Sequence, residues 1–188
     1  MNLPNKLTLI RIILIPVFVA VFYLEVIPFN YIVAAAIFAI AAFTDFLDGH
    51  IARKYNLVTD LGKFLDPIAD KVLVSTAFIV MLAPIGLVSY LPFYAGICVA
   101  VILARELIVS GFRMVAASKG VVLAADKSGK IKTFVQDIAI VVLLVSMNFN
   151  PLDILYIGGL VVLGIATILT IISGTECIVK NSFVIKSK

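Results

Sequence analysis

The chain has 188 residues, of which 63% are apolar and only 14% are charged. Its mean hydropathy of +1.19 excludes a soluble globular domain and predicts a protein that lives in membrane lipid. The formal net charge of +4 does not indicate a nucleic-acid partner, because excess lysine and arginine in a membrane protein marks its cytoplasmic loops. We expect one membrane domain over residues 1–188.

The fifteen lysines and arginines leave three long stretches without a cation, residues 12–52, 72–104 and 133–179. Each stretch is too long for one span of about 20 residues but fits two helices and a tight turn. Helix-breaking residues lie near the middle of each stretch: Pro28-Phe29-Asn30, Pro84-Ile85-Gly86 through Pro92, and Asn148-Phe149-Asn150-Pro151. The chain is therefore predicted to form three helical hairpins.

These hairpins predict an all-α, polytopic membrane protein with six transmembrane helices. The expected helices cover residues 7–24, 31–53, 64–83, 91–117, 131–147 and 152–174. Because every cation lies at an open end of a hairpin, the positive-inside rule places both termini and both long connections in the cytoplasm. Segment 3–8 can begin as a short interfacial helix before the chain enters the bilayer.

Four of the eleven acidic residues lie at the expected cytoplasmic ends of the second and third helices, as Asp45, Asp48, Asp66 and Asp70. Spacings of three and four residues put each pair on one helix face, and the short connection makes the two helices antiparallel neighbours. Each carboxylate at membrane depth costs about 2.5–3.5 kcal/mol, and four together repel one another. Hard divalent cations such as Mg²⁺ or Mn²⁺ relieve both costs. We expect two ions that act on a phosphoryl group.

Small residues and one arginine accompany these aspartates. Gly49 and Ala52 leave the surface of the second helix open to a ligand, and Gly62 does the same on the third. Arg53 offers a bidentate fork to phosphate. Close helix packing explains any one of the small residues equally well. His50, the only histidine, is expected to face solvent or lipid headgroups.

The pattern of residues 45–70 resembles the signature of the CDP-alcohol phosphotransferase family at every fixed position. It reads Asp45-x-x-Asp48-Gly49-x-x-Ala52-Arg53, then eight residues, then Gly62-x-x-x-Asp66-x-x-x-Asp70. Two further segments resemble bacterial members that use sn-glycerol 3-phosphate as the acceptor. They are Leu3-Pro4-Asn5-Lys6-Leu7-Thr8 and Arg105-Glu106-Leu107-Ile108.

The resemblance implies catalytic roles that spacing alone does not give. Asp45, Asp48 and Asp66 would bind metal, and Asp70 would lie at the second metal and act as general base on the acceptor hydroxyl. The acceptor oxygen would attack the β-phosphorus of CDP-diacylglycerol, and CMP would leave. With glycerol 3-phosphate as acceptor, the product would be phosphatidylglycerol phosphate.

The resemblance also implies how substrates and partners are bound. Gly49, Ala52, Arg53 and Gly62 would hold the cytidine diphosphate group. The protein would work as a homodimer among membrane lipids in the bacterial cytoplasmic membrane, with its active site facing the cytoplasm.

An acceptor that is a dianion needs cations in its pocket. The candidates are Arg105 and Arg113 on the fourth helix and Lys130 and Lys132 at the start of the fifth. Arg105 lies in a partly embedded segment, where functional arginines are common, although a contact with Glu106 or a lipid phosphate is an alternative. For the two lysines, the positive-inside rule is an equal explanation.

Three alternatives remain open at this stage. Intramembrane carboxylates also mark cation or proton transporters, although those sites lie near the midplane on interrupted helices. Membrane prenyltransferases also use aspartate-rich helices, but with different spacing. Within the resembled family, inositol phosphate or serine could be the acceptor.

Gln136 and Asp137 can extend the acceptor pocket or lie in water.

Overall fold

The computed structural model describes most of the chain as long helices. The described residues are 3–54, 60–83, 93–121, 123, 127–149 and 153–183. They form six α-helices and no β-strand, which confirms the all-α prediction. The helices are α1 (Leu3–Tyr23), α2 (Asn30–Lys54), α3 (Asp60–Leu82), α4 (Phe93–Ser118), α5 (Lys127–Ser146) and α6 (Ile154–Lys180).

Each expected helix has a counterpart, and the differences are at the ends. Helices α1, α3 and α5 begin about one turn earlier than expected. Segment 3–8 is helical, as anticipated, and continues directly into α1. Helix α6 does not end at Gly174 but runs to Lys180. Its last turns hold an ion pair one turn apart, with 3.9 Å between Lys180 Nζ and Glu176 Oε2, which favours a continued helix.

Three helices in the described residues are long and apolar enough to cross a bilayer. They are Asn5–Tyr23, Phe93–Ser118 and Ile154–Lys180, and Asn30–Asp45 is a shorter apolar helix. Large apolar side chains such as Leu107, Met114 and Ile168 are exposed on α4 and α6, as expected of helices that face lipid rather than water. The six-span topology stays a prediction.

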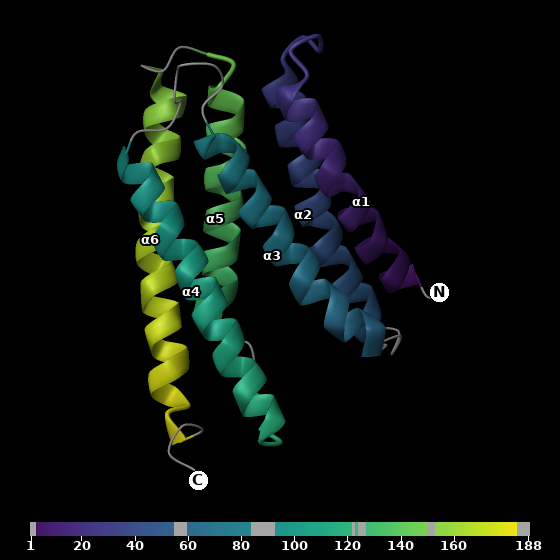
Figure 1. Cartoon of the computed structure of the whole chain (residues 1–188), viewed down its shortest axis with the longest axis vertical. Coiled ribbons are helices and arrows are strands. Elements are labelled where there is room, and N and C mark those ends of the chain that lie inside the picture. The colour runs from purple at the N-terminus through teal and green to yellow at the C-terminus, as the bar shows by residue number, and fades with distance from the viewer. Residues whose placement is uncertain are drawn as a thin grey trace. The chain divides into compact units, whose positions relative to one another are not determined.

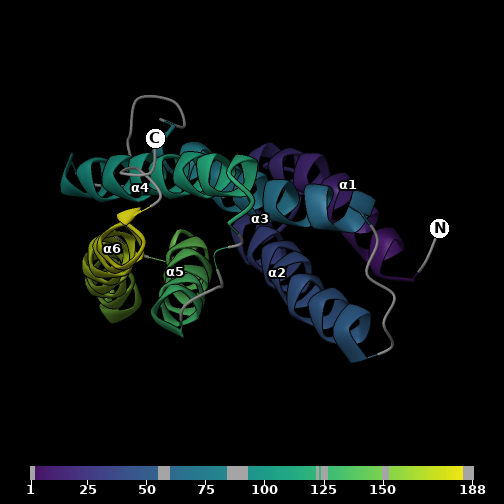
Figure 2. The ribbon, with the colours of Figure 1, turned by 90° about the horizontal axis from the view of Figure 1, so that it is seen from below.

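The chain divides into two compact units. Unit 1 comprises Met1–Tyr90 and Ile140–Ile157, and unit 2 comprises Leu91–Ala139 and Gly158–Lys188. In unit 1, α1 packs along both α2 and α3, as the two views in Figures 1 and 2 show. Phe18 and Phe22 of α1 and Phe38 of α2 are fully buried. Their rings pack in tilted pairs, with centroids 6.3 Å apart for Phe18–Phe22 and Phe18–Phe38, and the second pair joins α1 to α2.

A tight turn joins α1 to α2 where the sequence predicts the first hairpin. The buried Asn30 donates from Nδ2 to the carbonyl of Phe22 at 2.8 Å, satisfying a backbone acceptor at the end of α1. Phe29 takes the left-handed backbone conformation, with φ of 55°. The second expected turn, residues 84–92, lies outside the described residues, and the third, 148–151, lies partly outside them.

In unit 2, helix α4 ends in a turn built on a glycine. Gly120 has φ of 75° and donates to the carbonyl of Ala117 at 2.9 Å, while Val121 donates to that of Ala116 at 2.9 Å. This pair of bonds is the Schellman arrangement, which satisfies carbonyls at a helix end and requires a left-handed residue. Side chains of α5 and α6 are joined to α4 by the polar network described below.

Candidate active site

Helices α2 and α3 carry the aspartates expected to bind metal. Asp45 lies on α2, Asp66 and Asp70 lie on α3, and the two helices pack on each other. Only residues 55–59 separate them, so the end of α2 and the start of α3 lie at the same end of the pair (Figure 1). The expected antiparallel packing of the two aspartate-bearing helices is confirmed.

An arginine from α1 pairs with the aspartate on α2. Arg11 Nη1 lies 2.8 Å from Asp45 Oδ1, and the arginine side chain is 0% exposed while that of Asp45 is 43% exposed. Arg11 Nε also donates to the backbone carbonyl of Ala41 at 3.3 Å. Because Ala41 precedes Asp45 by one helical turn, the guanidinium joins the backbone of α2 to its carboxylate.

A threonine from α1 binds an aspartate on α3. Thr8 Oγ1 donates to Asp66 Oδ1 at 2.5 Å, and Thr8 is 1% exposed. Thr8 and Arg11 are three positions apart, so they lie on one face of α1. That face therefore contacts one proposed metal ligand on each neighbouring helix.

The other predicted residues of this region are described in part. Asp70 is half-buried one turn after Asp66, and Gly62 is buried near the start of α3. The remaining ones lie on the last turns of α2, and their side chains fall outside the described part of the structure: Asp48, Gly49, His50, Ala52 and Arg53. Their roles stay predictions.

The described side chains fit a hard divalent cation in their chemistry. Asp45, Asp66 and Asp70 offer carboxylate oxygens, which Mg²⁺ and Mn²⁺ prefer, with no thiolate among them. No three candidate ligands form one group among the residues whose side chains are described, and Asp48 is not among those residues. The four-carboxylate site thus remains a prediction that the donor types support.

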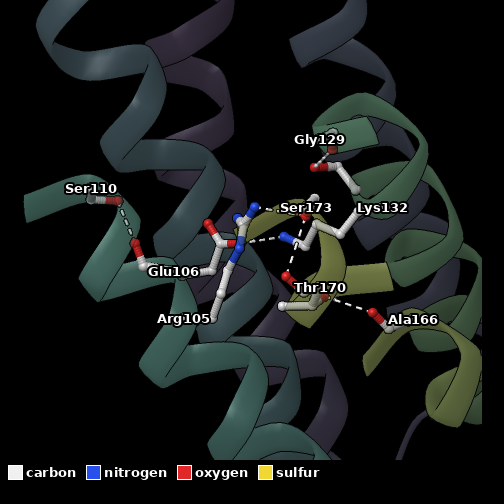
Figure 3. A network of polar contacts seen from close by, with 9 residues as sticks. Arg105, Glu106, Ser110, Gly129, Lys132, Ala166, Thr170 and Ser173 are labelled. Carbon is white, nitrogen blue, oxygen red and sulfur yellow. Dashed lines mark hydrogen bonds and ion pairs between the residues drawn. The ribbon is translucent and has the colours of Figure 1, made fainter. Parts of the chain in front are cut away.

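Unit 2 holds a second polar cluster, which contains two of the expected acceptor-binding cations. Arg105 and Lys132 both contact Glu106 Oε1, with 3.0 Å from Arg105 Nη1 and an ion pair from Lys132 Nζ (Figure 3). Arg105 Nη2 also donates to Ser173 Oγ on α6 at 2.7 Å. The cluster links α4, α5 and α6. The contact with Glu106 that the sequence left open is present, and the Lys132 side chain is buried, at only 4% exposed.

Gly174 makes room for Arg105 in this cluster. Gly174 is buried on α6, and a Cβ at this position would lie 2.8 Å from Arg105 Nε and 2.9 Å from its Cγ. Such distances are below normal contact, so a larger residue would push the arginine aside. The close approach of Arg105 to the backbone of α6 explains why residue 174 is a glycine, since the helix does not end there.

The other expected cations and polar residues lie apart from this cluster. Arg113 and Lys130 are exposed, and no contact joins them to the cluster in the described residues. Gln136 is buried one turn after Lys132, and its Oε1 has no hydrogen-bond partner among the described groups. It faces the interior, whereas Asp137 beside it is half-buried.

Three contact residues escaped the sequence reasoning. Thr8 and Arg11, in the cationic start of the chain, and Ser173 were not proposed as parts of a site, whereas Glu106 was expected only as an alternative contact of Arg105. A usable signal was the three-residue step of Asn5, Thr8 and Arg11, which puts polar side chains on one face of an apolar helix. All three are buried.

Comparison with known proteins gives relatives along nearly the whole chain. It is 42% identical to the CDP-diacylglycerol–glycerol-3-phosphate 3-phosphatidyltransferase of Bacillus subtilis, over 96% of this chain and 95% of the relative. The Rickettsia bellii protein of the same name is 44% identical, over 92% and 91%. The Salmonella paratyphi A protein of that name is 40% identical, over 90% and 89%.

The family comparison agrees with these relatives. Residues 1–173 match the CDP-alcohol phosphatidyltransferase family, and the matched region includes the aspartates of α2 and α3 and all but the end of α6. Together with the long apolar helices, this makes the protein a helical membrane enzyme of the transferase class. The chain belongs to the CDP-alcohol phosphatidyltransferase family.

Proposed function

We propose that the protein transfers the phosphatidyl group of CDP-diacylglycerol to sn-glycerol 3-phosphate, giving phosphatidylglycerol phosphate and CMP. The observation that carries this proposal is the match at 40–44% identity to proteins named for that reaction, along about nine-tenths or more of both chains. The aspartates of α2 and α3 supply groups suited to phosphoryl transfer.

The proposed cofactors are two divalent ions, Mg²⁺ or Mn²⁺, held by Asp45, Asp48, Asp66 and Asp70. When bound, they supply charge that polarises the phosphoryl group and stabilises the attacking and leaving oxygens. Asp70 takes the proton of the acceptor hydroxyl while the acceptor oxygen forms a bond to the β-phosphorus. The bond from that phosphorus to the CMP oxygen breaks, and CMP leaves with the electron pair.

The cytidine diphosphate group is proposed to lie on the small-residue surface formed by Gly49, Ala52 and Gly62, with Arg53 on its phosphates. Gly62 is buried on α3, which suits a close approach of the helix backbone to a ligand. This assignment follows the resemblance to the family signature.

The acceptor phosphate is proposed to bind Arg105 and Lys132, with Arg113 and Lys130 as outer cations. Glu106 lies against both inner cations, so the three charged groups sum to one positive charge, and a phosphate dianion complements them better than a neutral acceptor does. Inositol phosphate or serine in place of glycerol 3-phosphate would use the same transfer chemistry.

We further propose that residues 1–188 act as one functional domain, as a homodimer in the bacterial cytoplasmic membrane. The family match, which extends through both units, supports the single domain. The placement of the cations supports six spans, with both termini and the active site on the cytoplasmic side.

The test is CMP release by the purified protein in detergent, with CDP-diacylglycerol, Mg²⁺ or Mn²⁺, and each acceptor in turn. We expect metal-dependent release with glycerol 3-phosphate and a loss of about 100-fold or more in Asp70→Asn, the range for a general base. Asp153→Asn is the matched control, because Asp153 is exposed just before α6 and asparagine serves equally well there.

Other outcomes separate the parts of the proposal. Release with inositol phosphate or serine but not glycerol 3-phosphate would keep the chemistry and replace the acceptor. No release with any acceptor from well-folded protein would refute the proposed function.

A further inference from the structure

Helix α1 contributes two buried polar side chains to the aspartates of its neighbours. Thr8 and Arg11 are 1% and 0% exposed, and each directs its polar atoms to a carboxylate, Thr8 to Asp66 and Arg11 to Asp45. Burying a guanidinium and a hydroxyl is costly unless each is paired. Both side chains are paired with the residues that the proposed reaction needs.

We propose that Thr8 and Arg11 are positioning residues that fix the carboxylates of Asp66 and Asp45 for binding of divalent metal. The inference rests on the proposed function, because it takes both aspartates as metal ligands. Groups that hydrogen-bond a metal ligand set its orientation, and their loss lowers metal affinity. Thr8 and Arg11 have the contacts for this role and come from a helix outside the family signature at residues 45–70.

Arg11 fixes Asp45 through two separate atoms. Nε donates a hydrogen bond to the carbonyl of Ala41 at 3.3 Å, and Nη1 forms an ion pair with Asp45 Oδ1 at 2.8 Å. The planar guanidinium makes both contacts at once, so the carboxylate is linked to the backbone of its own helix one turn earlier. A lysine keeps the charge but has no such fork.

Thr8 fixes Asp66 through a side-chain hydrogen bond between residues 58 positions apart. Because Thr8 and Arg11 share one face of α1, that helix sets where the carboxylates of α2 and α3 stand relative to each other. The spacing of two ligands in a metal site is thus controlled by a third helix, which need not bind metal itself.

The primary test measures Mn²⁺ binding directly, by the electron paramagnetic resonance signal of free Mn²⁺ during titration of the detergent-solubilised protein. Thr8→Val removes the hydroxyl and keeps the side-chain shape. We expect its Mn²⁺ affinity to fall about 10- to 100-fold, the range for loss of a group that orients a metal ligand. Thr8→Ser keeps the hydroxyl and is expected to restore most of the affinity.

A second position and a matched control accompany this variant. Arg11→Lys is expected to weaken Mn²⁺ binding in the same direction, because one ammonium group cannot replace separate nitrogens that contact Ala41 and Asp45. Thr167→Val is the control, since Thr167 is a buried threonine of α6 whose hydroxyl donates to the carbonyl of Leu163 in its own helix. It should bind Mn²⁺ as the native protein does.

Activity measurements separate this inference from the proposed function. The Mn²⁺ concentration for half-maximal CMP release should rise in Thr8→Val by the same factor as the dissociation constant, and near-native kcat should return at saturating Mn²⁺. A purely structural role would lower the melting temperature and leave the metal dependence unchanged.

If the native protein is active, either of two results would overturn the inference. One is native Mn²⁺ affinity in folded Thr8→Val, and the other is failure of Thr8→Ser to restore affinity. If Thr8→Val does not fold, Thr8→Ala removes the same donor without placing a methyl group against Asp66, and the same criteria apply. If the native protein releases no CMP, the proposed function fails, and the Mn²⁺ titration still decides whether α1 orients these carboxylates.

Discussion

Gly174 shows how a single missing side chain can position a charged group. Its hydrogen occupies the place where any other residue would put a carbon 2.8 Å from Arg105 Nε. Arg105 therefore lies against the backbone of α6 and reaches Ser173 Oγ at 2.7 Å. A glycine inside a helix normally costs about 0.5–1 kcal/mol relative to alanine, and here close packing with an arginine explains its presence.

We predict that Gly174→Ala destabilises the protein by about 1–3 kcal/mol through overpacking. It should also raise the KM for glycerol 3-phosphate, because the displaced Arg105 belongs to the proposed acceptor site. Thermal unfolding in detergent and CMP-release kinetics would measure the two effects. Gly164→Ala is the control on the same helix, since a Cβ there meets nothing within 4 Å, and it should be neutral or stabilise by up to about 1 kcal/mol. Equal effects of the two changes would contradict the prediction.

The sequence singles out the aspartates as candidate metal ligands but not the residues that contact them. Asp45, Asp66 and Asp70 are visible because carboxylates are rare in apolar helices and follow helical spacing. Thr8 and Arg11 are harder to recognise, because an arginine near the start of a membrane helix is expected to orient the protein. The three-residue step of these polar residues indicates a shared face, and the packing of α1 against α2 and α3 shows that this face turns inward.

The end of α4 depends on one backbone conformation. Gly120 has φ of 75°, and this left-handed state allows both Gly120 and Val121 to donate to carbonyls of the last turn at 2.9 Å. Other residues pay a steric penalty in that state, because their Cβ approaches the neighbouring carbonyl oxygen. The turn fixes the direction in which the chain leaves α4.

We predict that Gly120→Ala costs about 1–2 kcal/mol of stability, the penalty for a Cβ in the left-handed region. A Cβ at Gly120 would have open space around it, so the effect isolates backbone strain from crowding. Gly111→Ala, in the interior of the same helix and also with open space, should stabilise by about 0.5–1 kcal/mol. Opposite shifts of the thermal midpoint are expected, and shifts of the same sign would argue against strain at Gly120.

The helices themselves follow from apolar length and breaker positions, whereas their ends do not. The sequence anticipated that segment 3–8 would be helical and lead into α1. Helices α3 and α5 begin a turn earlier than hydropathy suggests, and this was not anticipated. Polar residues can continue a helix beyond the apolar part, as the Glu176–Lys180 pair does at the end of α6. Hydropathy detects the part of a helix that suits lipid, and the hydrogen-bonded helix extends further.

The distribution of cations predicts the orientation of the whole protein in the membrane. The turn at residues 24–29 contains no lysine or arginine, whereas the end of α4 is followed by Lys119. The positive-inside rule therefore puts these two turns on opposite sides of the membrane, with the second in the cytoplasm.

We predict that single cysteines at these turns label from opposite sides. After Cys98 and Cys177, both free, are replaced by alanine, Val26→Cys at a 90% exposed position should react with a membrane-impermeant maleimide in intact spheroplasts. Ser118→Cys, also exposed, should react only after permeabilisation. Labelling of both from the same side would contradict the predicted topology.

The contacts of α1 with the aspartates have a consequence for the order of events during synthesis. Thr8, Arg11, Asp45 and Asp66 all lie in the first three helices, which end at Leu82. Translation proceeds from the N-terminus, so these helices are synthesised while more than half of the chain is still unmade. The nascent protein can therefore insert and pair Asp45 and Asp66 with α1 before α4 emerges. These two carboxylates then need no partner from the later helices while they lie in the membrane.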